Sequence, residues 1–147
     1  MKQYITKNGD IVLFDDEDFE TYKGENITLC DGYPAIGTGN DRIKVHNLLC
    51  PTYATLEVDH INRNKLDLQK VNLRAVTHGT NIQNAKRRKD STWPYKGVHL
   101  IHCGWQARIT VAGKRITKAG FKTIEEAARW YDQKVDEFYP GGYKNFP

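Results

Sequence analysis

The sequence predicts an α+β protein, in which a small β–β–α unit is followed by a three-stranded antiparallel sheet packed on one helix. Short runs alternate apolar and polar residues at the two-residue period of a strand, most clearly "WQARITV" (105–111). Residues 123–139 instead place apolar side chains three and four positions apart, as one face of a helix requires. Short strands and a single amphipathic helix can cover each other in two layers.

The composition describes a folded chain without a membrane segment. Hydrophobic residues make up 39% and aromatic residues 11% of the 147 residues, and no apolar run approaches the roughly 20 residues that span a bilayer. The first ten residues lack the apolar core of a signal peptide. The three cysteines are widely spaced, which argues against a disulfide framework or a thiolate zinc site and favours reduced thiols in the cytoplasm.

Residues 1–40 form the first expected segment, an amino-terminal leader. The apolar run "IVLF" (11–14) predicts a short strand, and the acidic run "DDEDFETY" (15–22) predicts a helical turn after it. The stretch "CDGYPAIGTGND" (30–41) contains glycines and a proline, which predict turns.

Residues 41–89 form the second expected segment, with strands and a helix in the order β–β–α. "TLEV" (55–58) predicts a strand, "NRNKLD" a turn and "VNLRAVT" (71–77) the returning strand. A helix is expected in "TNIQNAKRR" (80–88), with Thr80 as its cap. In this order, the end of the first strand and the first turn of the helix can face each other.

Two adjacent ionisable residues, Asp59 and His60, follow the first of these strands, and Asn81 begins the helix. Carboxylate and amide oxygens are hard ligands that suit Mg²⁺ or Mn²⁺, and two protein ligands leave room for a phosphate. A neutral imidazole can remove a proton from water, but His60 points away from Asp59 in an ideal pleat and needs a local twist. Spacing alone leaves a second interpretation open, in which the pair belongs to a turn and the asparagines cap helices.

A connector at 90–94 leads into the third expected segment, residues 95–147. Three strands are predicted, in "YKGVHL" (95–100), "WQARITV" and "KRITKAGF" (114–121), with a tight turn at "AGK". Residues Thr123 and Glu126 have the spacing of a capping box for the helix that follows. The apolar face of this helix is expected to contain Ile124, Ala127, Ala128, Tyr131, Val135 and Phe138.

Positive charge is concentrated in one part of the chain. The net charge is +4, but residues 84–118 carry nine basic residues and one acidic residue, whereas residues 1–40 carry three and eight. This imbalance indicates a polyanionic partner, although a solvated surface run is the alternative for "KRRK" alone. The run expected to follow a phosphate backbone is Lys86, Arg87, Arg88 and Lys89.

The sheet face opposite the helix is predicted to be polar and cationic. Such a sheet can enter the major groove of double-stranded DNA with side chains that reach base edges, and the alternative is an ordinary solvent-facing surface. The side chains expected on this face are Lys96, His99, Gln106, Arg108, Thr110, Arg115 and Thr117.

The stretch "VDHINRNKLDLQKVNLRAVTHGTNIQN" (58–84) resembles the ββα-metal motif of HNH endonucleases, in the branch common among phage and intron-encoded enzymes. The resemblance implies Asp59 and Asn81 as ligands of one Mg²⁺ or Mn²⁺ ion and His60 as the general base. It implies that Asn72 braces the loop presenting the histidine. His46 in "VHNLL" matches an upstream histidine of the family, whose role is structural or directed at phosphate.

Residues 95–147 resemble an AP2 DNA-binding domain in the motifs "YKGVHL", "WQARITV", "GFKTIEEAARWYD" and the final "NF". The resemblance implies three antiparallel strands over a helix, with DNA contacts made by the strands. The pairing of both motifs in one chain is typical of phage HNH endonucleases.

Together the two resemblances imply a metal-dependent endonuclease that hydrolyses phosphodiester bonds in double-stranded DNA, in the cytoplasm of a bacterial host. One active centre in a monomer predicts nicking of one strand at a time, whereas dimerisation would produce paired cuts. The expected enzyme is site-directed, of the homing type. The alternative from another class is a non-catalytic DNA-binding protein or regulator derived from such a nuclease. An RNA-directed enzyme is disfavoured because the predicted sheet lacks exposed aromatic residues that stack single-stranded bases.

Overall fold

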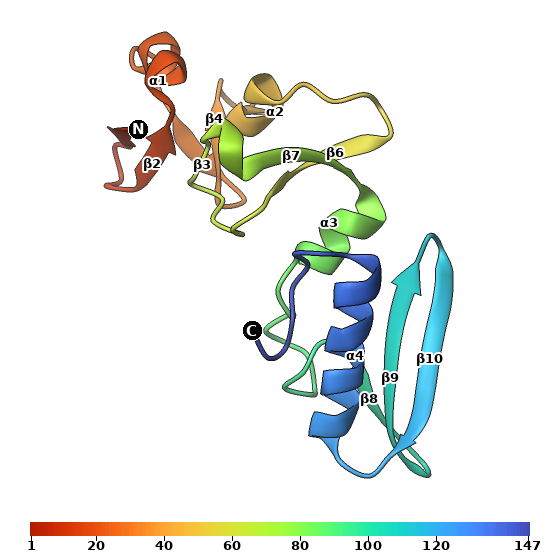
Figure 1. Ribbon diagram of the computed structural model, residues 1–147. Coiled ribbons are helices and arrows are strands. Elements are labelled where there is room, and N and C mark those ends of the chain that lie inside the picture. Colours follow the sequence, from red (N-terminus) through yellow and green to blue (C-terminus); the bar gives the residue numbers. More distant parts are fainter. The chain divides into compact units, whose positions relative to one another are not determined.

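The computed structural model describes all residues, 1–147, and divides them into two compact units, Met1–Thr77 and His78–Pro147. The protein is α+β, with four helices and four small antiparallel sheets (Figure 1). The boundary between the units falls between strand β7 (Leu73–Thr77) and helix α3 (His78–Asn84). No helix combines the length and the apolar character needed to cross a bilayer.

The first unit contains three of the sheets. The first sheet pairs β1 (Lys2–Ile5) with β2 (Ile11–Phe14), and the second joins β3 (Thr28–Cys30), β4 (Tyr33–Ile36) and β5 (Ile43–Lys44). The third pairs β6 (Leu56–His60) with β7 (Leu73–Thr77). Helices α1 (Asp16–Tyr22) and α2 (Val45–Leu49) and the 3₁₀ turn η1 (Lys70–Asn72) complete the unit. The predictions of a strand at 11–14 followed by a helical turn are confirmed.

One apolar core joins the amino-terminal residues to the loop between β6 and β7. Its fully buried members are Val12, Phe14, Ile27, Val45 and Leu68. Leu68 reaches this core because the loop pairs with β2: Leu13 N donates to Leu66 O at 2.8 Å, and Leu68 N donates to Leu13 O at 2.9 Å. The leader therefore supports the loop that follows His60, and both lie in the first unit.

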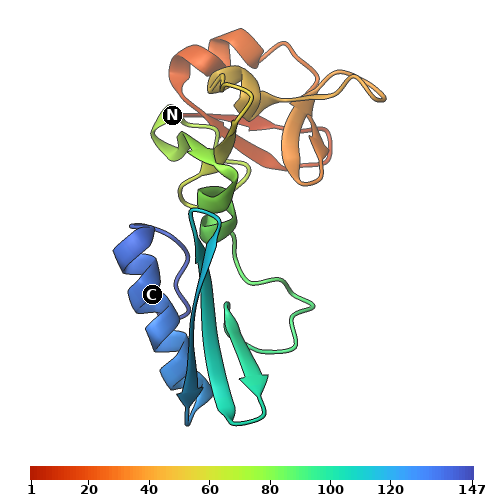
Figure 2. The same ribbon diagram turned by 90° about the vertical axis from the view of Figure 1, so that its right-hand side faces the viewer.

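The second unit is a two-layer structure (Figures 1 and 2). Strands β8 (Val98–Ile101), β9 (Gly104–Val111) and β10 (Lys114–Phe121) lie in the order β10–β9–β8, and α4 (Ile124–Phe138) covers one face. The short helix α3 (His78–Asn84) precedes the sheet. The second and third strands are confirmed. The first begins at Val98 instead of Tyr95, because Gly97 has a φ of +74° and interrupts the extended backbone.

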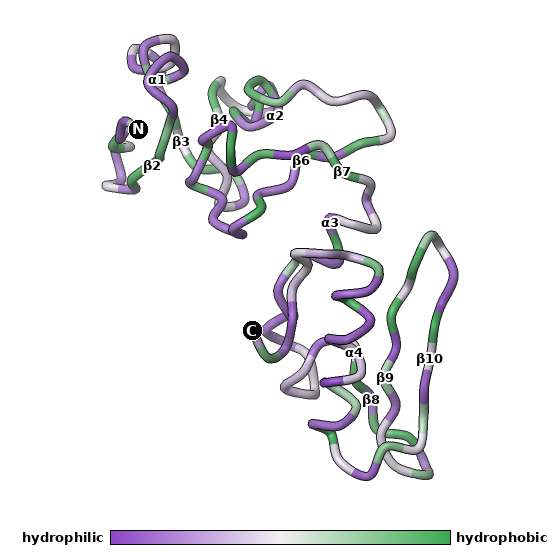
Figure 3. The backbone as a smooth tube through the Cα atoms, in the orientation of Figure 1, coloured by the Kyte–Doolittle hydropathy of each residue, from purple (hydrophilic) through white to green (hydrophobic).

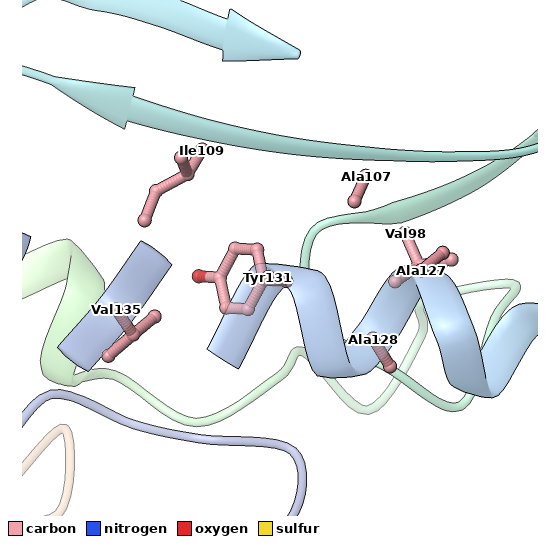
Figure 4. Close-up of a cluster of buried hydrophobic side chains, with 7 residues drawn as sticks. All are labelled: Val98, Ala107, Ile109, Ala127, Ala128, Tyr131 and Val135. Atoms are coloured by element: carbon pink, nitrogen blue, oxygen red, sulfur yellow. The ribbon is translucent and has the colours of Figure 1, made fainter. Parts of the chain in front are cut away.

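The core of the second unit lies between the three-stranded sheet and α4. It contains Val98, Ala107, Ile109, Ala127, Ala128, Tyr131 and Val135. Figure 4 shows Ala107 and Ile109 projecting from β9 toward the helix, as the predicted alternation requires. Phe138 was expected on the buried apolar face of this helix, and that expectation is wrong, because its side chain is 36% exposed. Phe138 is the last residue of α4, and the last buried residue of the helix is Val135.

Local sequence signals account for the ends of these elements. Thr123 caps α4 and forms the predicted capping box with Glu126. Ala112 and Gly113 have positive φ angles of 47° and 77°, as a two-residue hairpin turn requires. Figure 3 shows apolar and polar residues alternating around α4, which leaves its outer face hydrophilic.

Candidate functional site

Strand β6 ends in the two adjacent ionisable residues of the predicted site. Asp59 and His60 are 6% and 5% exposed. Asp59 lies directly opposite Arg74 on β7, and Arg74 Nε and Nη2 donate to Asp59 Oδ2 at 3.0 and 2.9 Å. Opposed residues of an antiparallel pair project from the same face, so the register produces this ion pair. Sequence reasoning missed Arg74, although the opposite charges in "LEVDH" and "LRAVT" were the signal.

The side chain of His60 contacts a different set of neighbours. Its ring centroid lies 5.1 Å from that of His46, at an interplanar angle of 86°, and 5.9 Å from that of Tyr33. The Tyr33 and His46 rings are themselves 5.0 Å apart. Three rings from β4, α2 and β6 therefore hold one another in place, and the imidazole of His60 is oriented by aromatic packing.

Burial determines the charge state of His60. It lowers the pKa of His60, and the nearby charge of Lys65 adds to the lowering, while Asp59 and Asp67 oppose it. The imidazole is therefore neutral near pH 7, and a neutral imidazole can accept a proton.

The imidazole of His46 is also neutral near pH 7. Burial lowers the pKa of His46 to about 4, with further lowering by His60, Lys44 and Lys65. The ring is 5% exposed, and its Nδ1 atom has no hydrogen-bond partner. A neutral, enclosed ring cannot pair with phosphate as a cation. Of the two roles expected for His46, structural or directed at phosphate, the geometry therefore favours the structural one.

Two lysines that sequence reasoning missed lie beside this cluster. The Nζ atoms of Lys65 and Lys44 are 3.9 and 4.6 Å from the Tyr33 ring centroid. Lys65 Nζ also donates to the carbonyl of Asp31 at 3.0 Å. No sequence pattern links Lys65 to the other two residues, because it lies in the loop between β6 and β7, whereas Tyr33 and Lys44 lie on the paired strands β4 and β5.

Asn72 closes the loop that follows His60. Its Oδ1 accepts from Asn62 N at 2.9 Å, and its Nδ2 donates to Asp67 O at 2.8 Å. Asn62 Nδ2 in turn donates to Asp67 Oδ2 at 2.7 Å. Asn72 is only 5% exposed, so its side chain is used within the loop. These hydrogen bonds join the two ends of the loop that follows His60.

Asn81, the second expected metal ligand, lies on α3 in the second unit and is partly buried. The helix begins at His78, so Thr80 lies inside its first turn, and the expectation that Thr80 caps it is wrong. Asp59 and Asn81 thus belong to different units. Their sharing of one ion stays a prediction.

The chemistry of these two residues fits a hard cation. No group of three or more His, Cys, Asp and Glu side chains is arranged to hold a metal ion. A site with one carboxylate and one amide differs from such a group, and it suits Mg²⁺, which keeps several of its waters. Oδ2 of Asp59 already accepts two hydrogen bonds from the positively charged Arg74 side chain. A metal ion bound to Asp59 would therefore be the second positively charged partner of this carboxylate.

In the second unit, the register brings most of the predicted DNA-binding side chains into cross-strand pairs. On the sheet face opposite α4, the pairs are His99 with Gln106, Arg108 with Thr117, and Thr110 with Arg115. Arg115, Thr110 and Thr117 are exposed, whereas the other three are partly buried. Burial, followed by the charge of Arg108, lowers the pKa of His99, so this side chain is neutral near pH 7.

The remaining predicted cations lie on the segment between α3 and β8. Lys86, Arg87 and Arg88 line a hollow of about 560 Å³ together with Trp93, Lys96 and His99. Lys89, Lys86 and Arg88 are exposed. Arg87 is used partly within the loop, because its Nη1 donates to the carbonyls of Arg88 and Ser91.

Lys96 does not lie on the expected first strand. It precedes β8, and its Nζ donates to the carbonyls of Ile82, Gln83 and Ala85 at the end of α3. Because this ammonium group donates to the carbonyls at the end of a helix, it does not lie on the sheet face that was expected to contact DNA.

No protein-family model, no curated protein and no solved structure matches the chain.

Proposed function

We propose that the protein is a metal-dependent endonuclease that hydrolyses phosphodiester bonds in double-stranded DNA. The observation that carries this is the surroundings of His60: its ring is enclosed by Tyr33 and His46, next in sequence to Asp59, at a loop that Asn72 closes. A general base requires an ordered and neutral imidazole, and burial, which lowers the pKa of His60, keeps this ring neutral near pH 7.

In this proposal His60 takes a proton from a water molecule. The water oxygen attacks phosphorus, and the bond from phosphorus to the leaving oxygen breaks. Asp59 and Asn81 would hold one Mg²⁺ or Mn²⁺ ion, which supplies charge stabilisation at the phosphate when bound. Asn72 keeps the loop closed, and His46 keeps the His60 ring in position.

The same proposal assigns the finer fold. Strands β6 and β7 with helix α3 correspond to the ββα-metal unit of HNH endonucleases, and the sheet β8–β10 with α4 corresponds to an AP2-like DNA-binding domain. The cross-strand pairs on that sheet support DNA binding because Arg108 and Arg115 lie among neutral polar side chains that can reach base edges. With one active centre in each chain, a monomer nicks one strand.

A second candidate, a non-catalytic DNA-binding regulator, is favoured by one observation. Arg74 already neutralises Asp59 by donating two hydrogen bonds to Oδ2. A carboxylate satisfied in this way is stable without a metal ion.

A plasmid-nicking assay with Mg²⁺, and with EDTA in its place, distinguishes the two candidates. The endonuclease converts supercoiled DNA to the open circle only with Mg²⁺. His60→Ala is expected to abolish nicking while DNA affinity, measured by fluorescence anisotropy, stays within about twofold of its original value. His102→Ala, at an exposed histidine between β8 and β9, is the matched control and should nick normally.

DNA affinity that survives in every variant, without nicking under any condition, would instead identify the regulator. For either candidate, affinity should fall steeply as salt rises, because several Lys and Arg side chains displace counterions.

A further inference from the structure

Helix α3 is too short to be stable by itself. It has seven residues, whereas isolated helices below about 12–15 residues are marginal in water. Its last carbonyl groups also lack partners within the helix, as at every helix end. The position of any side chain on α3, Asn81 included, therefore depends on the contacts that α3 makes with other elements.

Several of those contacts come from residues that follow α3 in the second unit. Lys96 Nζ donates to the carbonyls of Ile82, Gln83 and Ala85 at 2.7, 2.9 and 2.7 Å. A lysine ammonium has three donors, and here three carbonyls at the negative end of a helix accept from it. The end of α3 is capped by a cation from a separate segment.

Two tyrosines hold the same end of α3. The hydroxyl of Tyr131, a buried residue of α4, donates to Gln83 Oε1 at 2.8 Å, and Tyr143 N donates to Gln83 O at 3.2 Å. Gln83 is 7% and Asn84 2% exposed, so both of these residues at the end of α3 are buried.

A backbone hydrogen bond connects this anchor to Asn81. Lys96 Nζ donates to Ala85 O, and the N–H of the same residue, Ala85, donates to Asn81 O at 3.0 Å. A shift of Ala85 after loss of the ammonium therefore moves the backbone that carries the Asn81 amide.

We propose that Lys96 is a positioning residue for the metal ligand Asn81, acting through the carboxyl-terminal end of α3. This inference rests on the proposed function, in which Asn81 binds the ion. It replaces the DNA-contact role that the sequence suggested for Lys96. The two roles have opposite consequences: a phosphate contact affects DNA affinity, whereas a positioning residue affects metal dependence.

The test compares Lys96→Met with Lys96→Arg and Lys89→Met in the full-length chain. Lys96→Met keeps most of the apolar stem and removes the donors, whereas Lys96→Arg keeps donors and charge. Lys89→Met removes a lysine of the same basic stretch that is exposed. The measurements are the Mg²⁺ concentration for half-maximal nicking, DNA affinity without Mg²⁺, Mn²⁺ affinity by electron paramagnetic resonance, and hydrogen exchange of residues 78–85.

Lys96→Met is expected to raise the Mg²⁺ requirement, and to weaken Mn²⁺ binding, about 10-fold or more, the size typical of residues that orient a metal ligand. Exchange in α3 should become faster, DNA affinity should stay within about twofold, and Lys96→Arg should restore much of the loss. Lys89→Met should do the reverse, lowering DNA affinity and its salt dependence without changing the Mg²⁺ requirement.

The outcomes separate the inference from the proposed function. Normal metal dependence in Lys96→Met, with reduced DNA affinity, would overturn the inference and return Lys96 to a phosphate contact. A wild-type chain that never nicks DNA would overturn the proposed function and, with it, the role of Asn81. In that case faster exchange in Lys96→Met would still establish the cap on α3.

Discussion

Replacement of His46 tests whether burial governs the pH dependence of the first unit's stability. The folded unit binds a proton on His46 only near pH 4, whereas the unfolded chain binds it near the ordinary pKa of about 6.5. Between these values the unfolded state holds the extra proton, so the free energy of unfolding falls as pH falls. This contribution is fully present above about pH 6.5 and is lost on approaching pH 4.

The size of the effect follows from the shift. Each pKa unit corresponds to about 1.4 kcal/mol, so the His46 shift corresponds to about 3 kcal/mol over this range. The slope of the free energy of unfolding against pH should reach about 1.4 kcal/mol per pH unit from this one proton. His60 contributes in the same direction, because its pKa is also lowered.

The assay is urea unfolding at pH values from 4.5 to 7.5, in the wild type and in His46→Phe. All three tryptophans lie in the second unit, so far-UV circular dichroism reports both units and tryptophan fluorescence reports only the second. His46→Phe should flatten the pH dependence of the first unit's transition, and His102→Gln should leave it unchanged.

Titration of the imidazole carbon-bound protons by NMR in the wild type gives a second readout that does not depend on the variant folding. A His46 ring that titrates near pH 6.5, or a His46→Phe protein that keeps the full slope, would refute the reasoning.

Three further substitutions test the packing of the two units by urea unfolding. Gly97→Ala should lower the stability of the second unit by at least about 2 kcal/mol, because the new Cβ would lie 2.3 Å from two ring carbons of the buried Tyr131 and φ is +74°. Arg74→Met should lower the stability of the first unit by about 2 kcal/mol, because Asp59 loses two charge-assisted hydrogen bonds. Thr123→Ala should cost about 1 kcal/mol, because it removes the cap of α4.

Matched variants separate these causes from general effects of substitution. Gly113 also has a positive φ of 77°, but a Cβ there would meet nothing within 4 Å. Gly113→Ala should therefore cost much less than Gly97→Ala, and equal losses would contradict the proposed clash. Arg42 is exposed, and Arg42→Met should leave the first unit unaffected. Full stability in Arg74→Met would show that Asp59 does not depend on its arginine partner.

The elements that local residue patterns control were predictable from the chain alone. The alternation along 105–111 places Ala107 and Ile109 in the core, and Thr123 with Glu126 begins α4, because side-chain period and capping act within a few residues. The adjacency of Asp59 and His60 at a strand end was likewise visible in the sequence.

The partners of those residues depend on contacts between segments that are distant in the chain. Tyr33 and His46 reach His60 through packing of separate elements, and these contacts leave no periodic or spacing signal. Lys96 illustrates the same limit: its basic character predicted a nucleic-acid contact, but the fold gives it the carbonyls of α3. Charge and hydrogen-bonding capacity are properties of a residue, whereas the group that satisfies them is selected by chain folding.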